Sequence, residues 1–117
     1  MADENPHERW ALRTFEVVGH RWSALALCAL AERGALRRKE LAAAIPAVSA
    51  KVLTETLRRL ERDGLVERTE HASNPPRVDY DLTPLGREAH ELIQTVRRWG
   101  ERWLPQIEAA RAARERG

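Results

Sequence analysis

Charged and hydrogen-bonding side chains gather along one stretch of this sequence, between Ala50 and Arg62. Val52, Leu53, Leu57 and Leu60 recur there at a spacing of three or four residues, which predicts a helix with one buried stripe. The side chains left outside that stripe are Lys51, Thr54, Glu55, Arg58, Arg59 and Arg62. Such side chains on an exposed helix face can contact DNA phosphates and the edges of bases. Nucleic-acid recognition is therefore the first candidate chemistry.

Further basic residues flank this helix, with Arg37, Arg38 and Lys39 before it and Arg77 after it. The alternative is a solvated helix face on which basic and acidic side chains pair with one another. The residues concerned are Arg58, Arg59 and Arg62 with Glu55, Glu61 and Asp63. The stretch from Pro75 to Arg77 is likewise compatible with a plain hairpin turn. The sequence leaves both interpretations of these charges open.

Other reactive side chains form no recognisable catalytic or metal-binding pattern. The one cysteine, Cys28, lies on the flank of a predicted helix, either as a redox sensor or as a small packed hydrophobe. The four histidines, His7, His20, His71 and His90, lack the spacing of metal ligands. Paired acids, a Ser/His/Asp arrangement and phosphate-binding glycine loops are also missing from the sequence. We therefore predict neither an enzyme nor a cofactor.

Four tryptophans, Trp10, Trp22, Trp99 and Trp103, make up most of the aromatic residues. We interpret them first as large anchors of the core and of a dimer interface. The alternative is that they line a cavity between subunits where a planar small-molecule effector binds. In that case effector and DNA would weaken each other's binding reciprocally.

The composition is that of one globular domain. The chain has 117 residues, of which 43% are hydrophobic and 32% charged, and its formal net charge is +2. No run approaches the roughly 20 apolar residues of a membrane-spanning helix. The first residues include acids where a signal peptide would be basic and then apolar. These features predict a cytoplasmic protein without a membrane partner.

Helical signals fill the first half of the chain. Asn5 and Pro6 are typical of a helix start, and the helix they open is expected to run to Val18, with Gly19 closing it. A second helix is predicted over 21–33, ending at Gly34, with an apolar stripe centred on Trp22. Shorter helices are expected over 38–44, with Leu41, Ala44 and Ile45 facing inward, and over 50–62, capped by Ser49.

The second half begins with a predicted hairpin, because residues 65–71 and 77–82 alternate in polarity around a turn cluster at 72–76. Thr83 and Pro84 then provide the cap and first residue of a long helix. Its apolar residues are Ala89, Leu92, Ile93, Val96, Trp99, Trp103 and Ile107. Gly100 and Pro105 are expected to bend or interrupt this helix near Glu101.

This order of elements is that of a winged helix-turn-helix domain, mainly α with a small β-hairpin wing. We expect one domain over residues 1–117, in which 1–19 and 84–117 form dimerisation helices. Residues 20–83 then form the helix-turn-helix and the wing.

The sequence resembles the HxlR-type winged helix-turn-helix transcriptional regulators, bacterial relatives of the MarR group. The resemblance runs from about Phe15 to Trp99 and rests on several ordered motifs. They are Gly19-His20-Arg21-Trp22, Glu40-Leu41, the stretch 45–53 from Ile45-Pro46, the stretch 57–68 around Glu61-Arg62-Asp63-Gly64, and the stretch 75–86 ending in Thr83-Pro84-Leu85-Gly86. Three positions depart from the family pattern. Arg9 stands where some members have a redox-sensing cysteine, Arg38 where a Phe is usual, and His20 where a second Gly is usual.

The resemblance implies a homodimer that binds double-stranded DNA at a pseudo-palindromic operator. It implies a repressor or an activator, and we adopt repression as the working interpretation. The candidate DNA-binding residues are Arg37, Lys39, Ser49, Lys51, Thr54, Glu55, Arg58, Arg59 and Arg77. The alternative function is a winged-helix module that docks onto proteins and binds no DNA.

Overall fold

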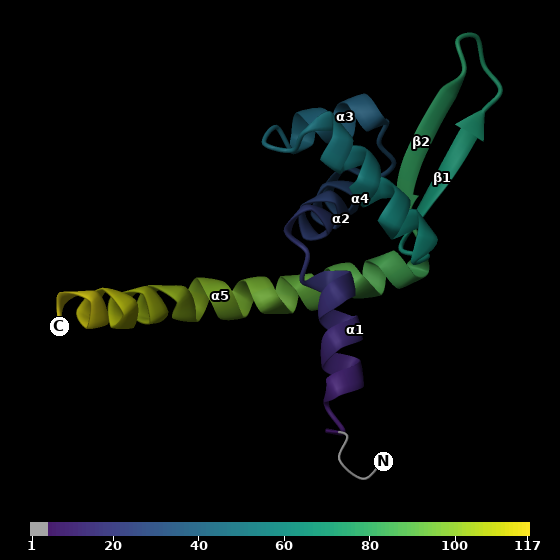
Figure 1. The fold of residues 1–117 in the computed structure, drawn as a ribbon. Coiled ribbons are helices and arrows are strands. Elements are labelled where there is room, and N and C mark those ends of the chain that lie inside the picture. Colours follow the sequence, from purple (N-terminus) through teal and green to yellow (C-terminus); the bar gives the residue numbers. More distant parts are fainter. Residues whose placement is uncertain (1–4) are drawn as a thin grey trace.

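The computed structural model describes residues 5–117, which form helices and one antiparallel hairpin (Figure 1). The elements follow in the order α1 (Glu8–Val18), α2 (Arg21–Arg33), α3 (Arg38–Ala44), α4 (Ala50–Arg62), β1 (Val66–His71), β2 (Arg77–Leu82) and α5 (Pro84–Arg116). The predicted elements are therefore present, and the fold is a winged helix-turn-helix. Residues 1–4, which belong to the expected N-terminal dimerisation segment, lie outside the described part of the chain.

Side-chain caps set the starts of two helices where the sequence predicted them. The Ser49 hydroxyl accepts a hydrogen bond from the Val52 N–H at 3.2 Å, and the Thr83 hydroxyl accepts one from the Gly86 N–H at 3.0 Å. Pro84 opens α5, where its missing N–H costs nothing. These bonds satisfy N–H groups that a helix start leaves without partners.

The first helix begins two residues later than predicted. Asn5 does accept a hydrogen bond through its side chain, but from the His7 N–H at 2.8 Å, and His7 is the residue that flanks the helix. The segment from Asn5 to His7 is therefore a turn that leads into α1. The predicted end is confirmed, because the Gly19 N–H donates to the Phe15 carbonyl at 2.9 Å.

The core lies where α2, α3 and α4 meet the base of the hairpin. Leu41 and Ile45 of α3 and its end are buried as predicted, and Ala44 packs against them. The buried stripe of α4 includes Thr56, which the polarity pattern did not predict, whereas Val52, predicted to be buried, is half-buried on the flank of the helix. The prediction that the buried stripe of α2 is centred on Trp22 is wrong. Leu27 is fully buried there, whereas Trp22 is half-buried and Leu25 is 44% exposed.

The hairpin pairs β1 with β2 in a register that runs from Val66 opposite Leu82 to His71 opposite Arg77. A short bridge adds to it, because Leu36 and Tyr80 exchange two backbone hydrogen bonds of 2.9 and 2.8 Å. Leu36 precedes α3 directly. The wing is thereby tied to the start of the helix-turn-helix.

The predicted interruption of α5 is wrong, because one helix continues from Pro84 to Arg116 through Pro105. A proline removes a single donor, and residues on both sides keep their own helical bonds, so a long exposed helix tolerates it. An ion pair of 2.7 Å between Arg97 and Glu101 spans the turn before it.

Two helices extend away from the core (Figure 1). The first part of α5 lies under α2, while its C-terminal half projects freely, and α1 projects from the other side of α5. The radius of gyration is 17.8 Å, compared with about 13 Å expected for a compact domain of this length. These two segments therefore lack the packing partners that a globular monomer would provide.

Candidate nucleic-acid interface

Helix α4 has four distinct sides at 100° per residue. Its core side carries Leu53, Thr56, Leu57 and Leu60, all buried. Directly opposite is an exposed line, which consists of Lys51, Glu55, Arg58 and Arg62. The flank toward α3 carries Ala50 and Thr54, and the flank toward α2 carries Val52 and Arg59. Only the exposed line and the rims of its flanks can meet a large partner.

Helix α3 is fastened to the start of α4 by Arg38. Its guanidinium donates a hydrogen bond of 2.8 Å to the Ala50 carbonyl oxygen. The start of α3 is fixed in turn, because the Arg37 N–H donates to Glu40 Oε1 at 2.8 Å. The arginine that departs from the usual phenylalanine thus holds the two helices of the motif together. The side chains of Arg37 and Lys39 stay exposed beside it.

The hydroxyl groups of Ser49 and Thr54, which are predicted to lie near the DNA, each make one hydrogen bond within the chain. Ser49 accepts the cap hydrogen bond and keeps its O–H free to donate. Thr54 donates to the Ala50 carbonyl oxygen at 3.0 Å and keeps its lone pairs free to accept. Each hydroxyl therefore has one remaining way to bond a partner at the rim of the exposed line.

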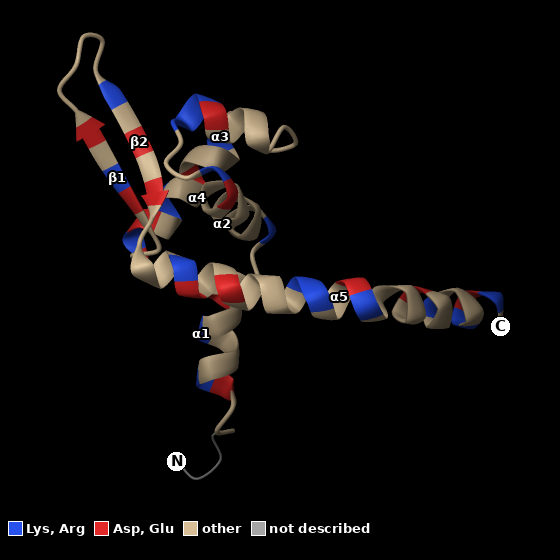
Figure 2. Ribbon diagram, turned by 180° about the vertical axis from the view of Figure 1, so that it is seen from behind, with Lys and Arg blue, Asp and Glu red and all other residues tan. Residues whose placement is uncertain are grey.

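The arginines of α4 are not neutralised by neighbouring acids. Within residues 5–117, ion pairs within 4 Å occur on α1, in the wing and on α5, and none involves α4. The stretch from Arg37 to Asp63 contains seven basic and four acidic residues, so it holds more positive charge than the whole chain, at +2. Basic residues mark the start of α3 in Figure 2. The structure thus favours unpaired cations over the paired, solvated face that the sequence left open.

The wing carries a different charge pattern. Arg77 lies exposed at the start of β2, but its guanidinium is 3.5 Å from Asp79 Oδ2, which also meets His71 Nε2 at 2.9 Å. Between Val66 and Leu82 acidic residues outnumber arginines (Figure 2). Arg77 is therefore the cation nearest the tip of an otherwise acidic hairpin, and Asp79 partly offsets its charge.

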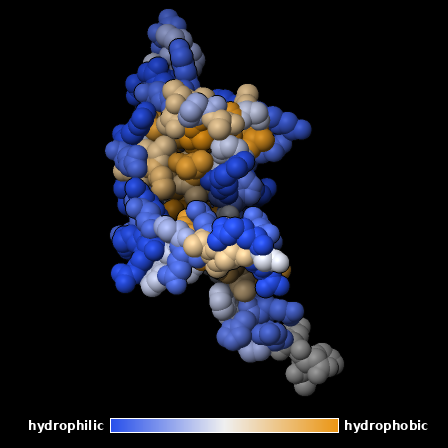
Figure 3. Space-filling view, turned by 90° about the vertical axis from the view of Figure 1, so that its left-hand side faces the viewer, coloured by the Kyte–Doolittle hydropathy of each residue, from blue (hydrophilic) through white to orange (hydrophobic). Residues whose placement is uncertain are grey.

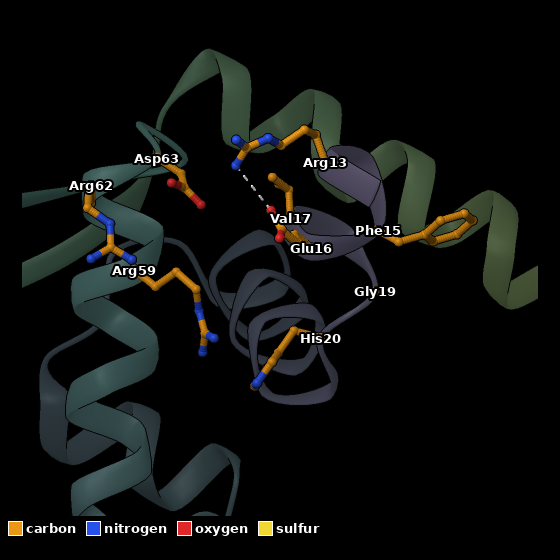
Figure 4. A pocket seen from close by; sticks show the side chains of 9 residues that line it. All are labelled: Arg13, Phe15, Glu16, Val17, Gly19, His20, Arg59, Arg62 and Asp63. Carbon is orange, nitrogen blue, oxygen red and sulfur yellow. Dashed lines mark ion pairs between the residues drawn. The ribbon is translucent and has the colours of Figure 1, made fainter. Parts of the chain in front are cut away.

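Arg59 differs from the other candidate residues on α4. It is half-buried on the flank that faces α2, and its Nε has no hydrogen-bond partner among the described residues. Figure 4 shows its side chain directed into the gap between α4 and α2, on the side of His20. The structure therefore separates Arg59 from the exposed line with which the sequence analysis grouped it.

Comparison with known proteins gives this arrangement a family. The sequence pattern of the HxlR-like helix-turn-helix family matches residues 17–108. The chain belongs to the HxlR-like helix-turn-helix family. The match covers α2 to α4, the wing and most of α5, so it includes every element of the interface described above.

Relatives of this HxlR-family chain are transcriptional regulators. It is 34% identical over 102 residues to the uncharacterized HTH-type transcriptional regulator YdeP of Bacillus subtilis, covering 87% of this chain and 79% of YdeP. It is 40% identical over 102 residues to the uncharacterized HTH-type transcriptional regulator YtfH of Escherichia coli, covering 85% and 80%. The reduced form of the regulator YodB from Bacillus subtilis superimposes with a TM-score of 0.72 at 32% identity, covering 86% and 94%.

Two kinds of site receive no support from the described residues of this HxlR-family chain. No group of three or more His, Cys, Asp or Glu residues within 5–117 is arranged to hold a metal ion. No helix in that range is both long and apolar enough to cross a membrane. The family and the named relatives place the chain among transcriptional regulators.

The four tryptophans do not come together within one HxlR-family chain. Trp22 packs against the core, as the first interpretation predicted. Trp10 on α1 is 54% exposed, and its Nε1 donates a hydrogen bond of 3.0 Å to His7, whose ring it also meets edge to face. Trp99 and Trp103 share one side of α5 and are largely exposed. The alternative interpretation, a tryptophan-lined cavity between two subunits, stays a prediction, because a single chain does not test it.

Cys28 lies half-buried on α2. Burial raises the pKa of its thiol, and nearby Glu32 raises the pKa further against a smaller opposing effect of Arg97. A raised pKa keeps the thiol protonated at neutral pH, and the protonated form is the less reactive one. The structure thus gives no reason to propose Cys28 as a redox switch.

Proposed function

We propose that this protein is a homodimeric repressor whose two α4 helices each read one half of a pseudo-palindromic operator. The observation that carries the proposal is the exposed line of α4, where Lys51, Arg58 and Arg62 stand without acidic partners. An α-helix fits the major groove of DNA, and arginine is well suited to bind guanine edges there. Family membership supports the same conclusion.

The neighbouring elements would hold the duplex by its backbone. Arg37 and Lys39 lie at the start of α3, and Ser49 and Thr54 at the rim of α4, within reach of phosphates that flank the groove. Arg77 would contact the backbone from the wing. Contacts of this kind position the protein, whereas Lys51, Glu55 and Arg58 would select the sequence.

A dimer would cover the apolar surfaces that one chain leaves open. Leu92, Val96, Trp99 and Trp103 follow one another on α5 at spacings of four, three and four residues, the spacing of a helix seam. We call these four residues the α5 stripe. Viewed toward the C-terminal end of α5, Figure 3 shows further apolar residues gathered on the body above that helix. A second copy seated in this corner would bury both surfaces.

The division of labour follows from this arrangement. We infer that α1 and the second half of α5 serve dimerisation, and that residues 20–83 serve DNA binding. The first turns of α5 belong with the DNA-binding part, because Gly86 is buried and Ala89 and Ile93 pack against the core. Because α5 would then belong to both parts, a rearrangement of the dimer would move the base of the wing through this one continuous helix.

Arg58 and Arg77 are expected to affect DNA binding differently. Arg58→Ala should lower affinity for the operator about tenfold or more while changing affinity for random DNA less, because it removes a base contact. Arg77→Ala should weaken binding to both DNAs alike and reduce the salt slope by about one unit, because it removes a phosphate contact. Both are measured by titrating the DNA upstream of the protein's own gene at two salt concentrations.

Arg111→Ala is the matched control, since Arg111 is an exposed arginine near the C-terminal end of α5, off the side that carries the α5 stripe and far from α4 and the wing. Its DNA affinity should equal that of the unchanged protein. Equal losses on specific and random DNA for Arg58→Ala would contradict base recognition by that side chain. Binding that is weak and indifferent to salt for the unchanged protein would instead favour a protein-docking module.

A further inference from the structure

A cleft separates the C-terminal half of α4 from the loop that joins α1 to α2. Gly19 and His20 line it from the loop, and Arg59 and Arg62 line it from α4 (Figure 4). The side chains of His20 and Arg59 point into the cleft, while the ring of Phe15 points away from it. Helices α1 and α4 and the loop before α2 thus contribute to one hollow, which shares Arg62 with the exposed line of α4.

Two nitrogen atoms in this cleft lack the partners that buried polar atoms normally have. His20 Nδ1 and Arg59 Nε are both shielded from solvent, and neither has a hydrogen-bond partner among the described residues. Most buried polar atoms in proteins are paired, so each exception calls for an explanation. A guanidinium can only donate. A ligand that brings acceptor oxygens would therefore satisfy Arg59.

The charge around the cleft favours an anion. Arg59 and Arg62 make no ion pair within the described residues, whereas Glu16 on the rim is paired with Arg13 at 3.5 Å. Asp63 is the other acid that lines the cleft, and it makes no ion pair within the described residues. Burial lowers the pKa of His20, and the charges of Arg59 and Arg21 lower it further. An anion between these groups would offset their mutual repulsion.

A second groove adjoins the first and has an apolar wall. It shares His20, Arg59 and Arg62 with the cleft and adds Trp22 and Val52, together with Glu55 and Arg58 of the exposed line of α4. Its volume of about 470 Å³ falls in the range of small-molecule pockets. The guanidinium of Arg21 lies 4.2 Å from the centre of the Trp22 ring and holds that ring in place. Positive charge therefore stands beside a flat hydrophobic surface.

We propose that the cleft and the adjoining groove together bind one small aromatic carboxylate. Its carboxylate group would lie between Arg59, Arg62 and His20, and its ring would lie against Trp22 and Val52. Bound there, the ligand would connect α1 and α2 with α4. Its negative charge would also stand next to Arg62 on the DNA-facing line of α4. The consequence for operator binding rests on the function proposed above, whereas ligand binding itself does not.

A DNA phosphate is the rival occupant, and the geometry disfavours it. Arg59 is displaced by about 80° around α4 from the line through Lys51 and Arg58, at 100° per residue. A duplex seated against that line would meet Arg58 and Arg62 first. The Arg59 Nε is shielded from solvent within the flank, where a small molecule has access and a duplex backbone is held off by the surrounding helices.

The direct test uses sodium benzoate as the probe, titrated calorimetrically into the full-length protein without DNA. Benzoate should bind at least about tenfold more tightly than acetate, because only benzoate buries a ring. Arg59→Gln should weaken benzoate binding at least about tenfold through loss of charge-assisted hydrogen bonds. Arg87→Gln, an exposed arginine on the first turn of α5, should leave it unchanged.

Several outcomes would overturn the proposal. Absence of benzoate binding would do so, and so would equal binding by the unchanged protein and a folded Arg59→Gln variant. Binding of inorganic phosphate with equal strength would reject the aromatic class of ligand. A loss of DNA affinity in Arg59→Gln without any benzoate binding would assign the cleft to a DNA phosphate instead.

The pH dependence provides a second readout that a merely structural role of His20 would not produce. Benzoate favours protonated His20, so its affinity should rise as pH falls from about 7.5 to about 5.5, where the carboxylate stays ionised. His20→Gln should remove this dependence. The other charged groups that face the site are Arg13, Glu16, Arg21, Glu55, Arg58, Arg59, Arg62 and Asp63. An unchanged pH profile in His20→Gln would contradict the role of His20.

The regulatory consequence is measured separately. Saturating benzoate should lower operator affinity about fivefold or more in the unchanged protein and have no effect in Arg59→Gln. If benzoate binds but no DNA is bound in its absence, the ligand site stands and the proposed repressor function fails. If DNA is bound and benzoate leaves its affinity unchanged, the coupling between the two sites fails.

Discussion

Replacing Gly86 with alanine is expected to destabilise the fold by about 3 kcal/mol or more, the cost of forcing an atom into a packed interior. A Cβ at Gly86 would overlap the Leu65 carbonyl oxygen and come within 3.2 Å of Leu82 Cδ2. That carbonyl cannot move aside easily, because it accepts a hydrogen bond from the Thr83 N–H at 3.1 Å. The Thr83 hydroxyl further fixes this turn by donating to the Gly64 carbonyl oxygen at 2.6 Å. The substitution therefore forces the base of the wing away from α5.

Gly100→Ala is the matched control on the same helix. Its added Cβ would meet Leu104 Cδ1 at 3.5 Å, an ordinary contact. Because alanine favours helix over glycine, this variant should gain up to about 1 kcal/mol. Urea denaturation of the two variants measures both free energies of unfolding. A Gly86→Ala variant as stable as the unchanged protein would show that the turn yields, contrary to this expectation.

The parts of the fold that the sequence predicted depend on local chemistry. Ser49 and Thr83 cap their helices where the pattern of polar and apolar residues changes, because a hydroxyl at that position satisfies N–H groups of its own first turn. The hairpin strands alternate in polarity for the same local reason. The error at α1 is also local, since an Asn-Pro pair opens either a helix or a turn that precedes one.

The parts that it missed depend on contacts between distant segments. Leu36 pairs with Tyr80 across more than forty residues, and no periodicity in either segment indicates that bond. Counting 100° per residue along α4 separates Arg59 from Arg58. It does not show that Arg59 lies in a cleft, because His20 on the opposite wall belongs to a distant segment. The exposed tryptophans lack a partner within one chain, and the dimer proposed above would supply that partner from a second copy.

A second prediction concerns dimerisation through the α5 stripe, which one chain leaves exposed. Val96 lies in the middle of the α5 stripe and its side chain is 58% exposed. In a dimer, Val96→Asp would bury a carboxylate without a partner, which costs far more than the lost methyl groups. We expect dimerisation to weaken about 100-fold or more, with affinity for the full operator falling and affinity for a half-site unchanged. Sedimentation equilibrium measures the first quantity and DNA titration the others.

Leu85→Asp separates this effect from a general penalty for charge on α5. Leu85 is 56% exposed, so its exposure resembles that of Val96, but it lies in the first turn of the helix, eleven residues before Val96 and next to the DNA-binding part. An aspartate near a helix N-terminus is favourable, because it interacts with the positive end of the helix dipole. Leu85→Asp should therefore remain dimeric and bind the full operator. If Val96→Asp also remained dimeric, the seam would lie elsewhere, and α1 with Trp10, Leu12 and Phe15 would have to form the interface without α5.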